Sequence, residues 1–406
     1  MIYKAGSLIY RLLIRLLAPF HFKAKASFDG RKGWEERLKS FKAAHLDKKI
    51  IWMHCASTGE FEQGRSLIEE LKEKNPSSRI LLTFFSPSGY EAKKNYPLAD
   101  HIDYLPFDSR NNARTFLDIL NPDLAFFVKY EFWPFYLEEI GKREIKLFLV
   151  SGIFRENQLF FKYPKTSKIL SAFRHFYLQD HFSAQLLEKI GYKNSSVTGD
   201  SRLDRVITVR DTAFTDRIIE DFTNNKTIVA GSTWLADQQL LIEYIRREAD
   251  WKLMLIPHEL DNKKLQEIRT QLKDIAFAFY SEDPNQEALN KAQVLVVDTM
   301  GMLSKLYRYG CICYIGGGFG KGIHNILEAA VYLKPVFFGP NHKKFKEAKD
   351  LIDLEVAYSI SNYNELENII KTVTKEAKSK KTEKNALHYI NTNAGAAKKI
   401  IQSLEI

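Results

Sequence analysis

Two glutamates stand directly after predicted strands, where catalytic groups of α/β proteins are often found. Glu60 ends the segment HCASTGE (residues 54–60), which follows the apolar run Ile50–Met53. Gly59 allows a tight turn whose backbone amides can approach a ligand. A carboxylate that opens the next helix could act as a general base. The alternative is a glutamate that only stabilises the helix dipole in the first turn.

The second glutamate, Glu131, lies in the segment KYEFWP (129–134) after the apolar run Leu124–Val128. Pro134 suits the first turn of a helix, and Trp133 offers a flat apolar surface. A capped helix with an aromatic residue in the core would explain this segment taken alone. Two carboxylates at neighbouring strand ends of one sheet indicate a site more strongly than one does.

A glycine-rich loop follows the run Ile312–Ile315 and holds five glycines within residues 316–322. Bare backbone amides before a helix predict an anion site suited to a nucleotide phosphate. The spacing differs from G-x-G-x-x-G and lacks G-K-[ST], which argues against a dinucleotide or Walker site. We expect Glu328 to share a helical face with His324 and to hold ribose hydroxyls. A flexible turn is the alternative.

Polar loops follow several other predicted strands, although each alone is also compatible with an ordinary loop. They comprise Pro257-His258, Asp298–Gly301, Gly339–His342 and Gly199–Arg202. Arg202 could meet a phosphate or a carboxylate. The ten histidines form no H-x-x-x-H or H-x-H pair, and no D-x-D motif is present. The sequence therefore predicts no catalytic metal.

Short apolar runs alternate with amphipathic stretches such as Phe61–Lys74 and Trp133–Lys142. This alternation predicts parallel sheets that are covered on both faces. It pauses at about residues 200–225 and then restarts, which predicts two Rossmann-like domains facing each other across a cleft, with ligands beyond the carboxyl ends of the strands. The predicted strands are Lys49–Met53, Ile80–Phe85, Leu124–Val128, Leu147–Val150 and Phe176–Leu178, then Ile228–Ala230, Leu253–Ile256, Val294–Val297, Ile312–Ile315 and Val336–Phe338.

Length and composition agree with two globular domains. A chain of 406 residues is too long for one ordinary core, and 45% hydrophobic residues exclude a disordered protein. We assign residues 1–22 to a membrane-associated helix, 23–210 to an N-terminal domain and 225–406 to a C-terminal domain. Cys55, Cys311 and Cys313 form no disulfide framework or zinc spacing, which indicates a reducing compartment without a structural metal.

Positive charge is concentrated at the N-terminus. The chain carries a net charge of +10, and residues 1–43 hold ten basic and three acidic side chains. Such a segment favours an anionic surface, either membrane or nucleic acid. Lys4, Arg11 and Arg15 fall on one helical face, opposite an apolar face formed by Leu8, Ile9, Leu12, Leu13, Leu16 and Leu17. The pattern is typical of a helix in a membrane interface and is too short and charged to span a bilayer. A packed helix and a cleaved signal ending near Ala24-Lys25-Ala26 are the alternatives.

The ordered set of motifs resembles the Kdo (3-deoxy-D-manno-octulosonic acid) transferases of lipopolysaccharide synthesis. The resemblance runs from about Trp52 to about Leu354 and implies a GT-B fold, with the donor nucleotide on the second domain and the acceptor on the first. Its segments are HCASTGE (54–60), TFFSPSGYE (83–91), YLPFD (104–108), EFWP (131–134), VTGDSRLD (197–204), DTMG (298–301), GGGFGKGIHNILEAA (316–330) and FFGPNHKKFKEA (337–348).

By this resemblance Glu60 is the general base and Glu131 a second essential carboxylate. The family's CMP contacts fall on Pro257, His258, Met300, Gly301, Met302, Asn325, Ile326, Leu327 and Glu328, to which the glycine loop adds Gly317, Gly318 and His324. Ser57, Thr58 and Gly59 form the acceptor-side loop. The chain departs from the family at three of these positions: the family often has Arg at 258, Glu at 302 and Lys at 202.

The implied reaction is transfer of Kdo from CMP-Kdo to a lipid A precursor (lipid IVA) with inversion and release of CMP. Arg202 would stabilise the departing phosphate. We expect no cofactor, no metal, no nucleic acid partner, and an enzyme held on the cytoplasmic face of the inner membrane of a Gram-negative cell, either peripherally or by its N-terminus. The alternatives are another GT-B nucleotide-sugar transferase or epimerase, and a non-catalytic membrane-surface protein on this fold.

Overall fold

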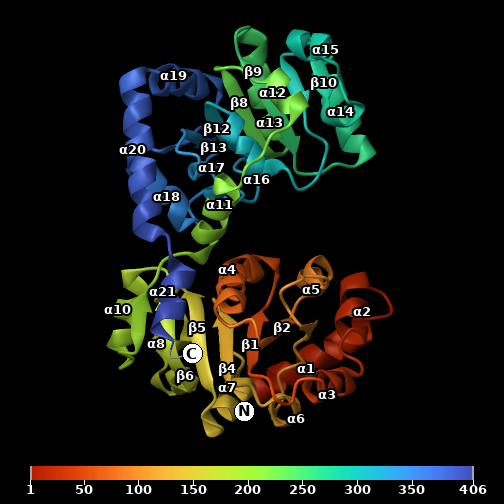
Figure 1. Cartoon of the computed structure of the whole chain (residues 1–406), viewed down its shortest axis with the longest axis vertical. Helices are drawn as coiled ribbons and strands as arrows, with labels where there is room; N and C mark the ends of the chain where they lie inside the picture. The colour runs from red at the N-terminus through yellow and green to blue at the C-terminus, as the bar shows by residue number, and fades with distance from the viewer. Residues whose placement is uncertain (1, 405–406) are drawn as a thin grey trace. The chain divides into compact units, whose positions relative to one another are not determined.

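The structure, a computed structural model, describes residues 2–404 and contains two compact units (Figure 1). Unit 1 comprises Met1–Asp204 and Asn393–Ile406, and unit 2 comprises Arg205–Thr392. Helix α11 (Ser201–Asp211) contains the division between them. Each unit is an α/β fold with a seven-stranded, wholly parallel sheet, which confirms the predicted fold class.

The sheet of unit 1 has the order β3-β2-β1-β4-β5-β6-β7. From β1 the chain builds outward to β3 and then returns to place β4 on the other side of β1. Main-chain register pairs Trp52 with Ala125 across these two strands. The point where strand order reverses is where open α/β sheets bind ligands. The strands are β1 (Ile50–Cys55), β2 (Arg79–Phe84), β3 (His101–Tyr104), β4 (Leu124–Val128), β5 (Lys146–Gly152), β6 (Phe173–Leu178) and β7 (Ser195–Val197).

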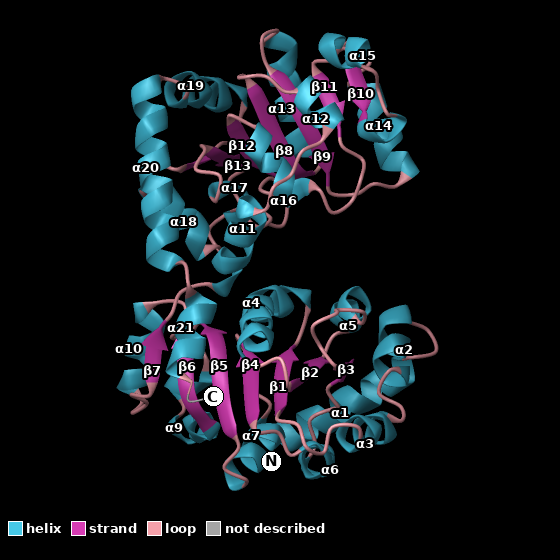
Figure 2. Cartoon of the chain, viewed as in Figure 1, coloured by secondary structure: helices cyan, strands magenta, loops and turns pink. Residues whose placement is uncertain are grey.

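Helices cover both faces of this sheet (Figure 2). One buried cluster includes Trp52, Phe116 and Tyr136, and a second includes Phe61 and Phe126. Parallel strands need cover on both faces because both carry apolar side chains. The helices are α1 (Ile2–Leu17), α2 (Phe22–Asp29), α3 (Trp34–Ala43), α4 (Thr58–Lys74), α5 (Pro87–Lys93), α6 (Arg110–Leu120), α7 (Pro134–Lys142), α8 (Leu159–Lys162), α9 (Pro164–Ser167), η1 (Lys168–Ala172), α10 (His181–Lys189) and α21 (Ala396–Ser403).

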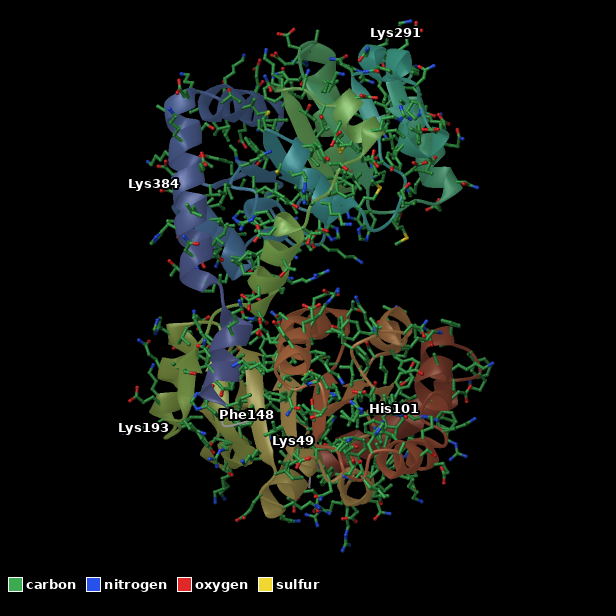
Figure 3. All side chains as sticks on the ribbon, viewed as in Figure 1. Lys49, His101, Phe148, Lys193, Lys291 and Lys384 are labelled. Carbon is green, nitrogen blue, oxygen red and sulfur yellow. The ribbon has the colours of Figure 1, made fainter. Side chains whose placement is uncertain are left out.

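The last helix, α21, belongs to unit 1, whereas the predicted C-terminal domain extended to residue 406. Ile400 and Ile401 are buried in the core cluster that contains Phe148, whose position on β5 is labelled in Figure 3. Asp204 accepts hydrogen bonds from the amides of Gly395 (2.6 Å) and Ala397 (2.8 Å) at the start of α21. The two isoleucines of α21 therefore help to cover the sheet of unit 1, whose last strand ends at Val197.

Helix α1 packs on unit 1 with one face and exposes the other. The Tyr3 hydroxyl donates to Asp108 (2.6 Å), Ser7 donates to the Asp108 carbonyl (2.5 Å), and Tyr10 stacks on Phe85. The predicted apolar face (Leu8, Ile9, Leu12, Leu13, Leu16 and Leu17) is 49–68% exposed. Arg15 is exposed and Arg11 is half-buried, while the Lys4 side chain lies outside the described residues. Over the described residues, none of the helices combines the length and the apolar character that crossing a bilayer requires.

The sheet of unit 2 has the order β10-β11-β9-β8-β12-β13-β14, so its strand order reverses between β8 and β12. Its strands are β8 (Thr227–Thr233), β9 (Lys252–Pro257), β10 (Phe277–Phe279), β11 (Val294–Val296), β12 (Ile312–Ile315), β13 (Val336–Phe338) and β14 (Ala357–Ser359). Its helices are α12 (Arg217–Phe222), α13 (Leu235–Arg247), α14 (Asn262–Gln271), η2 (Tyr280–Glu282), α15 (Gln286–Lys291), α16 (Leu303–Leu306), η3 (Tyr307–Tyr309), α17 (Leu327–Ala330), α18 (Lys346–Asp353), α19 (Tyr363–Val373) and α20 (Glu376–Asn393).

Candidate active site

Glu60 and Glu131 both lie at the reversal point of the unit 1 sheet. Glu60 is in the first turn of α4 after β1, and Glu131 lies between β4 and α7. Because β1 and β4 are adjacent and parallel, their carboxyl ends meet at one edge. Burial raises the pKa of the Cys55 thiol well above its ordinary value, and the charges of Glu60 and Glu131 add to this effect. The charges of both carboxylates are therefore felt at Cys55, the last residue of β1.

Glu60 is half-buried and its carboxylate accepts a hydrogen bond from the Ser57 hydroxyl. Ser57 is also the N-cap of α4, since its Oγ accepts from the amide of Gly59 (3.2 Å). Thr58 is the first helical residue, and Gly59 is exposed. The serine hydroxyl thus orients the carboxylate at the mouth of the sheet. This arrangement suits a general base and also stabilises the start of the helix.

The loop that carries Ser57 is held against the start of α5. The amide of Ser86 donates to the carbonyl of Ala56 (2.8 Å). A Cβ at Gly89 would lie 3.1 Å from the Ser57 backbone. Gly89, in the predicted TFFSPSGYE segment, is therefore needed because two backbones approach closely. Its contribution to the site is to fix the loop before Glu60.

Glu131 is 7% exposed and is held by two side chains. Trp133 Nε1 donates to Glu131 Oε2 (2.8 Å), and His54 Nε2 lies 3.2 Å from the same oxygen. His54 is fully buried in β1, and its Nδ1 lies 2.9 Å from Thr83 Oγ1 in β2. Trp133 therefore binds the carboxylate in addition to packing in the core. Sequence reasoning missed His54, although it opens the HCASTGE segment directly.

Arg202 lies in unit 1 at the start of α11. Its Nε and one terminal nitrogen contact the Asp200 carboxylate, at 3.0 Å and 2.5 Å. The neighbouring Ser201 contacts Ser151 at the end of β5 (2.7 Å) and the carbonyl of Gln63 in α4. The start of α11 therefore lies beside α4, the helix whose first turn contains Glu60. Asp200 neutralises part of the charge that a phosphate would otherwise meet.

In unit 2 the glycine loop follows β12 at the reversal point, but many of its amides are already used. Gly317 donates to Asp237 Oδ2 (2.9 Å), Gly320 donates to the Gly317 carbonyl (2.9 Å), and His324 donates to the Gly316 carbonyl (3.2 Å). The expectation that the Gly317 amide holds a phosphate is therefore not supported. A Cβ at Gly318 would lie 2.5 Å from the amide nitrogen of Gly339, so close packing against the backbone that follows β13 demands a glycine there.

The fully buried Asp237 fixes the base of this loop from α13. Besides Gly317, it accepts from the Tyr314 hydroxyl (2.7 Å) and the Trp234 amide (2.9 Å). Burial raises its pKa, and these hydrogen bonds oppose the shift. Sequence reasoning missed Asp237 and Trp234, although the segment GSTWLAD follows the predicted strand Ile228–Ala230 as the other motifs follow theirs.

Three aromatic rings stack beside the glycine loop. Trp234 packs on His258 (4.6 Å between ring centroids), and His258 packs on His324 (4.4 Å). Trp234 Nε1 also donates to His324 Nε2 (3.2 Å). Trp234, His324 and the loop line a cavity of about 510 Å³, the size of a small-molecule pocket. Two predicted donor residues, His258 and His324, are thus in contact, while Pro257 ends β9.

The remaining predicted donor residues lie in two other segments. Helix α17 begins only at Leu327 and has four residues, so His324 and Glu328 do not share a helical face as expected. Instead Glu328 accepts from the Asn325 amide group (3.0 Å), and Ile326 is the buried N-cap. Met300, Gly301 and Met302 form the loop before α16. Met300 is 85% exposed.

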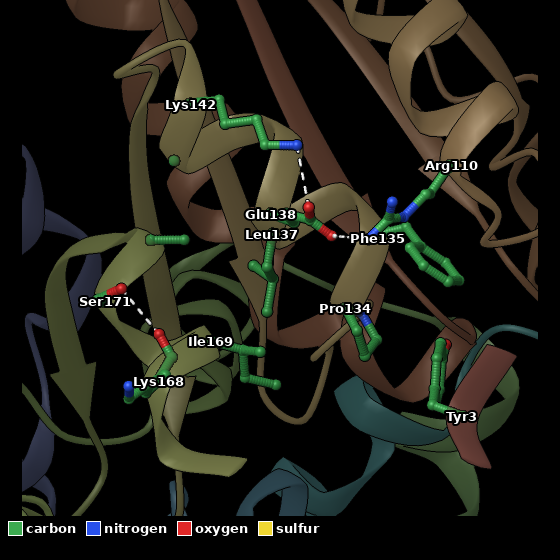
Figure 4. A pocket seen from close by; sticks show the side chains of 12 residues that line it. Tyr3, Arg110, Pro134, Phe135, Leu137, Glu138, Lys142, Lys168, Ile169 and Ser171 are labelled. Atoms are coloured by element: carbon green, nitrogen blue, oxygen red, sulfur yellow. Dashed lines mark hydrogen bonds and ion pairs between the residues drawn. The ribbon is translucent and has the colours of Figure 1, made fainter. Parts of the chain in front are cut away.

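A cavity of about 800 Å³ in unit 1 contains none of the predicted catalytic residues (Figure 4). Its lining includes the buried Leu137 and the exposed cations Arg110, Lys142 and Lys168. Glu138 contacts Lys142 (2.9 Å) and Arg110 (3.6 Å), which reduces the positive charge of the lining. No cluster of three or more potential metal ligands occurs among the residues that the structure describes.

Comparison with known proteins points to one family. Residues 32–205 match the family described as 3-Deoxy-D-manno-octulosonic-acid transferase (kdotransferase). A 3-deoxy-D-manno-octulosonic acid transferase of Rickettsia typhi is 26% identical over 360 residues (85% of this chain, 77% of the relative), and one of Aquifex aeolicus is 27% identical over 345 residues (82% and 86%). These matches support the Kdo transferase family for this chain.

A further relative is longer than the Kdo transferases. A bifunctional glycosyltransferase/methyltransferase of Fusobacterium nucleatum subsp. nucleatum is 25% identical over 394 residues, which cover 92% of this chain. The chain spans 59% of the length of that relative. The match to the Kdo transferase family covers most of unit 1, including Glu60, Glu131 and Arg202.

Solved structures with low sequence identity share the fold. A UDP-GlcNAc 2-epimerase of Neisseria meningitidis aligns with a TM-score of 0.62 at 15% identity, covering 87% of this chain and 98% of that one. A glycosyltransferase of Rickettsia africae aligns with a TM-score of 0.58 at 14% identity, covering 88% and 97%. These likenesses support the two-unit α/β architecture that the Kdo transferase motifs implied.

Proposed function

We propose that this protein transfers Kdo from CMP-Kdo to a lipid A precursor, with inversion at the anomeric carbon and release of CMP. The observation that carries the proposal is the pair of carboxylates, Glu60 and Glu131, at the reversal point of the unit 1 sheet. Similarity to the Kdo transferase family supports the sugar and the type of reaction.

In the proposed reaction Glu60 removes a proton from a primary hydroxyl of the acceptor. That oxygen attacks the anomeric carbon of Kdo, and the bond from this carbon to the CMP phosphate oxygen breaks. Arg202 would stabilise the phosphate as it departs, and a ligand phosphate would then compete with Asp200 for the guanidinium. We propose that no metal or other cofactor takes part.

The donor would bind in unit 2, in the cavity beside the glycine loop. Trp234 and His324 line this cavity, and aromatic rings of this kind offer stacking surfaces for a nucleobase. Lys321 also lines it and supplies a positive charge for the phosphate of CMP or the carboxylate of Kdo. His258 supports the other two rings from between them.

Incubation of the purified protein with CMP-Kdo and tetraacylated lipid A precursor tests the proposal. We expect Kdo-bearing lipid and free CMP in equal amounts, and neither product without the lipid. A thermal-shift comparison of CMP with UDP and GDP tests the donor separately, with CMP expected to stabilise most. Stabilisation by UDP alone, without Kdo transfer, would indicate a different nucleotide-sugar enzyme.

We also propose that the protein works on the cytoplasmic face of the inner membrane of a Gram-negative cell, held peripherally through α1. The exposed leucines of α1 would enter the interface, and Arg11 and Arg15 would lie near anionic headgroups. A lipid-linked acceptor would then reach the enzyme without leaving the bilayer.

A further inference from the structure

His54 is a buried polar side chain whose two ring nitrogens both have partners. It lies near the carboxyl end of β1 with 0% exposure. Its ring packs edge-on against Phe127 (5.4 Å between centroids) in the neighbouring strand β4. Placing an imidazole among apolar strands costs free energy unless its nitrogens are hydrogen-bonded. The partners of these nitrogens therefore indicate what the residue does.

On one side, Nδ1 lies 3.1 Å from the Thr83 carbonyl oxygen and 2.9 Å from Thr83 Oγ1. Nδ1 can donate to this carbonyl oxygen or accept from the Thr83 hydroxyl, depending on the tautomer of the ring. Thr83 Oγ1 also accepts from Trp52 Nε1 (2.8 Å), and its own hydroxyl points to the Met53 carbonyl (3.4 Å). These contacts fix the orientation of the imidazole ring.

On the other side, Nε2 lies 3.2 Å from Glu131 Oε2 and 3.1 Å from Trp133 Nε1. The indole N–H can only donate, and it reaches Oε2 at the shorter distance of 2.8 Å. A hydrogen bond between Nε2 and Oε2 requires a proton between these two atoms. When Nε2 carries that proton, His54 Nε2 and Trp133 Nε1 both donate to the same oxygen, Glu131 Oε2. Both of these contacts of Glu131 are made by Oε2, and the other oxygen, Oε1, takes part in neither.

The geometry points to His54 as a positioning residue for Glu131. Together with Trp133 it holds Oε2, so that Oε1 is presented to the reacting groups in a fixed direction. Trp52 in β1 binds Thr83 in β2, Thr83 holds the His54 ring, and the ring in turn contacts Glu131 in the loop after β4. This inference rests on the proposed function, because it concerns the role of Glu131 in Kdo transfer. Misplacing such a group by about 1 Å typically costs on the order of a hundredfold in rate.

Two substitutions of His54 test the contributions of its two ring nitrogens separately. His54→Gln can place its amide N–H near the position of Nε2 and so keep a donor for Glu131. His54→Asn places its amide near the position of Nδ1 and leaves Glu131 with Trp133 alone. We expect His54→Asn to lower kcat by about ten- to a hundredfold with an unchanged KM for CMP-Kdo, and His54→Gln to recover most of that loss.

A double-mutant cycle tests whether His54 acts through Glu131. In a Glu131→Gln background, His54→Asn should cause no further loss of kcat, since the group that it positions is already altered. Unchanged kcat in His54→Asn, equal losses in His54→Asn and His54→Gln, or additive losses in the double variant would each overturn the inference. An inactive wild-type protein would instead contradict the proposed function.

Because β1 is central, His54→Asn could prevent folding, which a melting curve would reveal. In that case Trp133→Phe replaces it in the same cycle. Trp133 is only half-buried, and a phenyl ring keeps an aromatic contact with Phe85 (4.5 Å between ring centroids in the wild type) while removing the second donor. A kcat that is unchanged, or a loss that adds to that of Glu131→Gln, would contradict the positioning of Oε2.

Discussion

The position of Glu60 suits two roles, stabilising the start of α4 and acting as a general base. Its carboxylate binds the hydroxyl of Ser57, which is the N-cap of α4. A capping role affects the stability of the helix, at about 1 kcal/mol. A role as general base affects the rate far more, because a positioned base contributes about 10²–10⁴-fold. The relative size of the two effects therefore distinguishes them.

We predict that Glu60→Gln lowers kcat by about 10²–10⁴-fold while CMP affinity and folding are retained. Steady-state kinetics and calorimetry with CMP measure both quantities. Glu62→Gln is the matched control, since Glu62 lies in the same helix and pairs with Lys93 (2.7 Å). Near-normal turnover of Glu60→Gln would contradict the assignment of the base.

His324 makes the stability of unit 2 sensitive to acid. Burial, with a contribution from His258, lowers the pKa of His324 below its ordinary value of about 6.5. The unfolded chain then binds a proton at a higher pH than the folded chain does. The stability associated with neutral His324 is therefore complete above about pH 6.5 and is lost as the pH falls from there toward the lower folded-state pKa.

We predict that His324→Gln reduces the loss of melting temperature between neutral and mildly acidic pH. Glutamine cannot bind the proton, so this part of the pH dependence disappears. The exposed His388 provides the control, since His388→Gln should leave the profile unchanged. Parallel melting profiles for wild type and His324→Gln would show that His324 does not contribute.

At the scale of elements, α21 shows how sequence order and packing order differ. The helix follows all of unit 2, yet Ile400 and Ile401 lie in the core beside Leu67 and Phe148 of unit 1. The Tyr177 hydroxyl contacts Ser403 (2.6 Å), which links β6 to the same helix. Unit 1 therefore requires both ends of the chain for its complete core.

We predict that Ile400→Ala destabilises unit 1 by about 2–5 kcal/mol, the usual cost of truncating a buried isoleucine. Denaturant unfolding followed by tryptophan fluorescence would report on this unit in a background with Trp234→Phe and Trp251→Phe, because the other three tryptophans lie in unit 1. Lys398→Ala, at an exposed position of the same helix, should have little effect. Loss of stability confined to unit 2 would contradict the assignment of α21.

At the scale of the whole molecule, charge and exposed apolar surface coincide at the N-terminus. Residues 1–43 hold ten of the 60 basic side chains, and α1 exposes its leucines. Deleting the helix would also remove the contacts of Tyr3 and Tyr10 with unit 1. Substitutions on the exposed face therefore test membrane binding more cleanly than truncation does.

We predict that the double variant Leu12→Gln, Leu16→Gln binds anionic vesicles more weakly and melts like the wild type. The two leucines are 49% and 68% exposed, so they contribute little to folding. Cosedimentation across a salt series should show that the remaining binding fades with salt, since each cation adds about 1 kcal/mol near an anionic surface. Tyr10→Ala should lower the melting temperature instead. Full vesicle binding by the leucine variant would contradict the interfacial role of α1.

The sequence by itself determined the central strands of both sheets. All ten predicted strands are present, and they are β1, β2, β4, β5 and β6 in unit 1 and β8, β9, β11, β12 and β13 in unit 2. Such strands are covered on both faces and therefore appear as continuous apolar runs. The four strands that sequence reasoning missed, β3, β7, β10 and β14, are the edges of the two sheets. They have only three or four residues each, so their apolar signal is weak.

Glycine-containing loops and single carboxylates after strands were also visible in the sequence, because tight turns restrict the residue types that can occupy them. Only the tertiary structure decided which of these groups meet. Contacts between His54 and Glu131, between Trp234 and His324, and between α21 and unit 1 join residues 77 or more positions apart. The use of the Gly317 amide by Asp237 is a contact of the same kind. Local patterning predicts the elements, whereas partners of this kind depend on strand order and packing, which no short segment encodes.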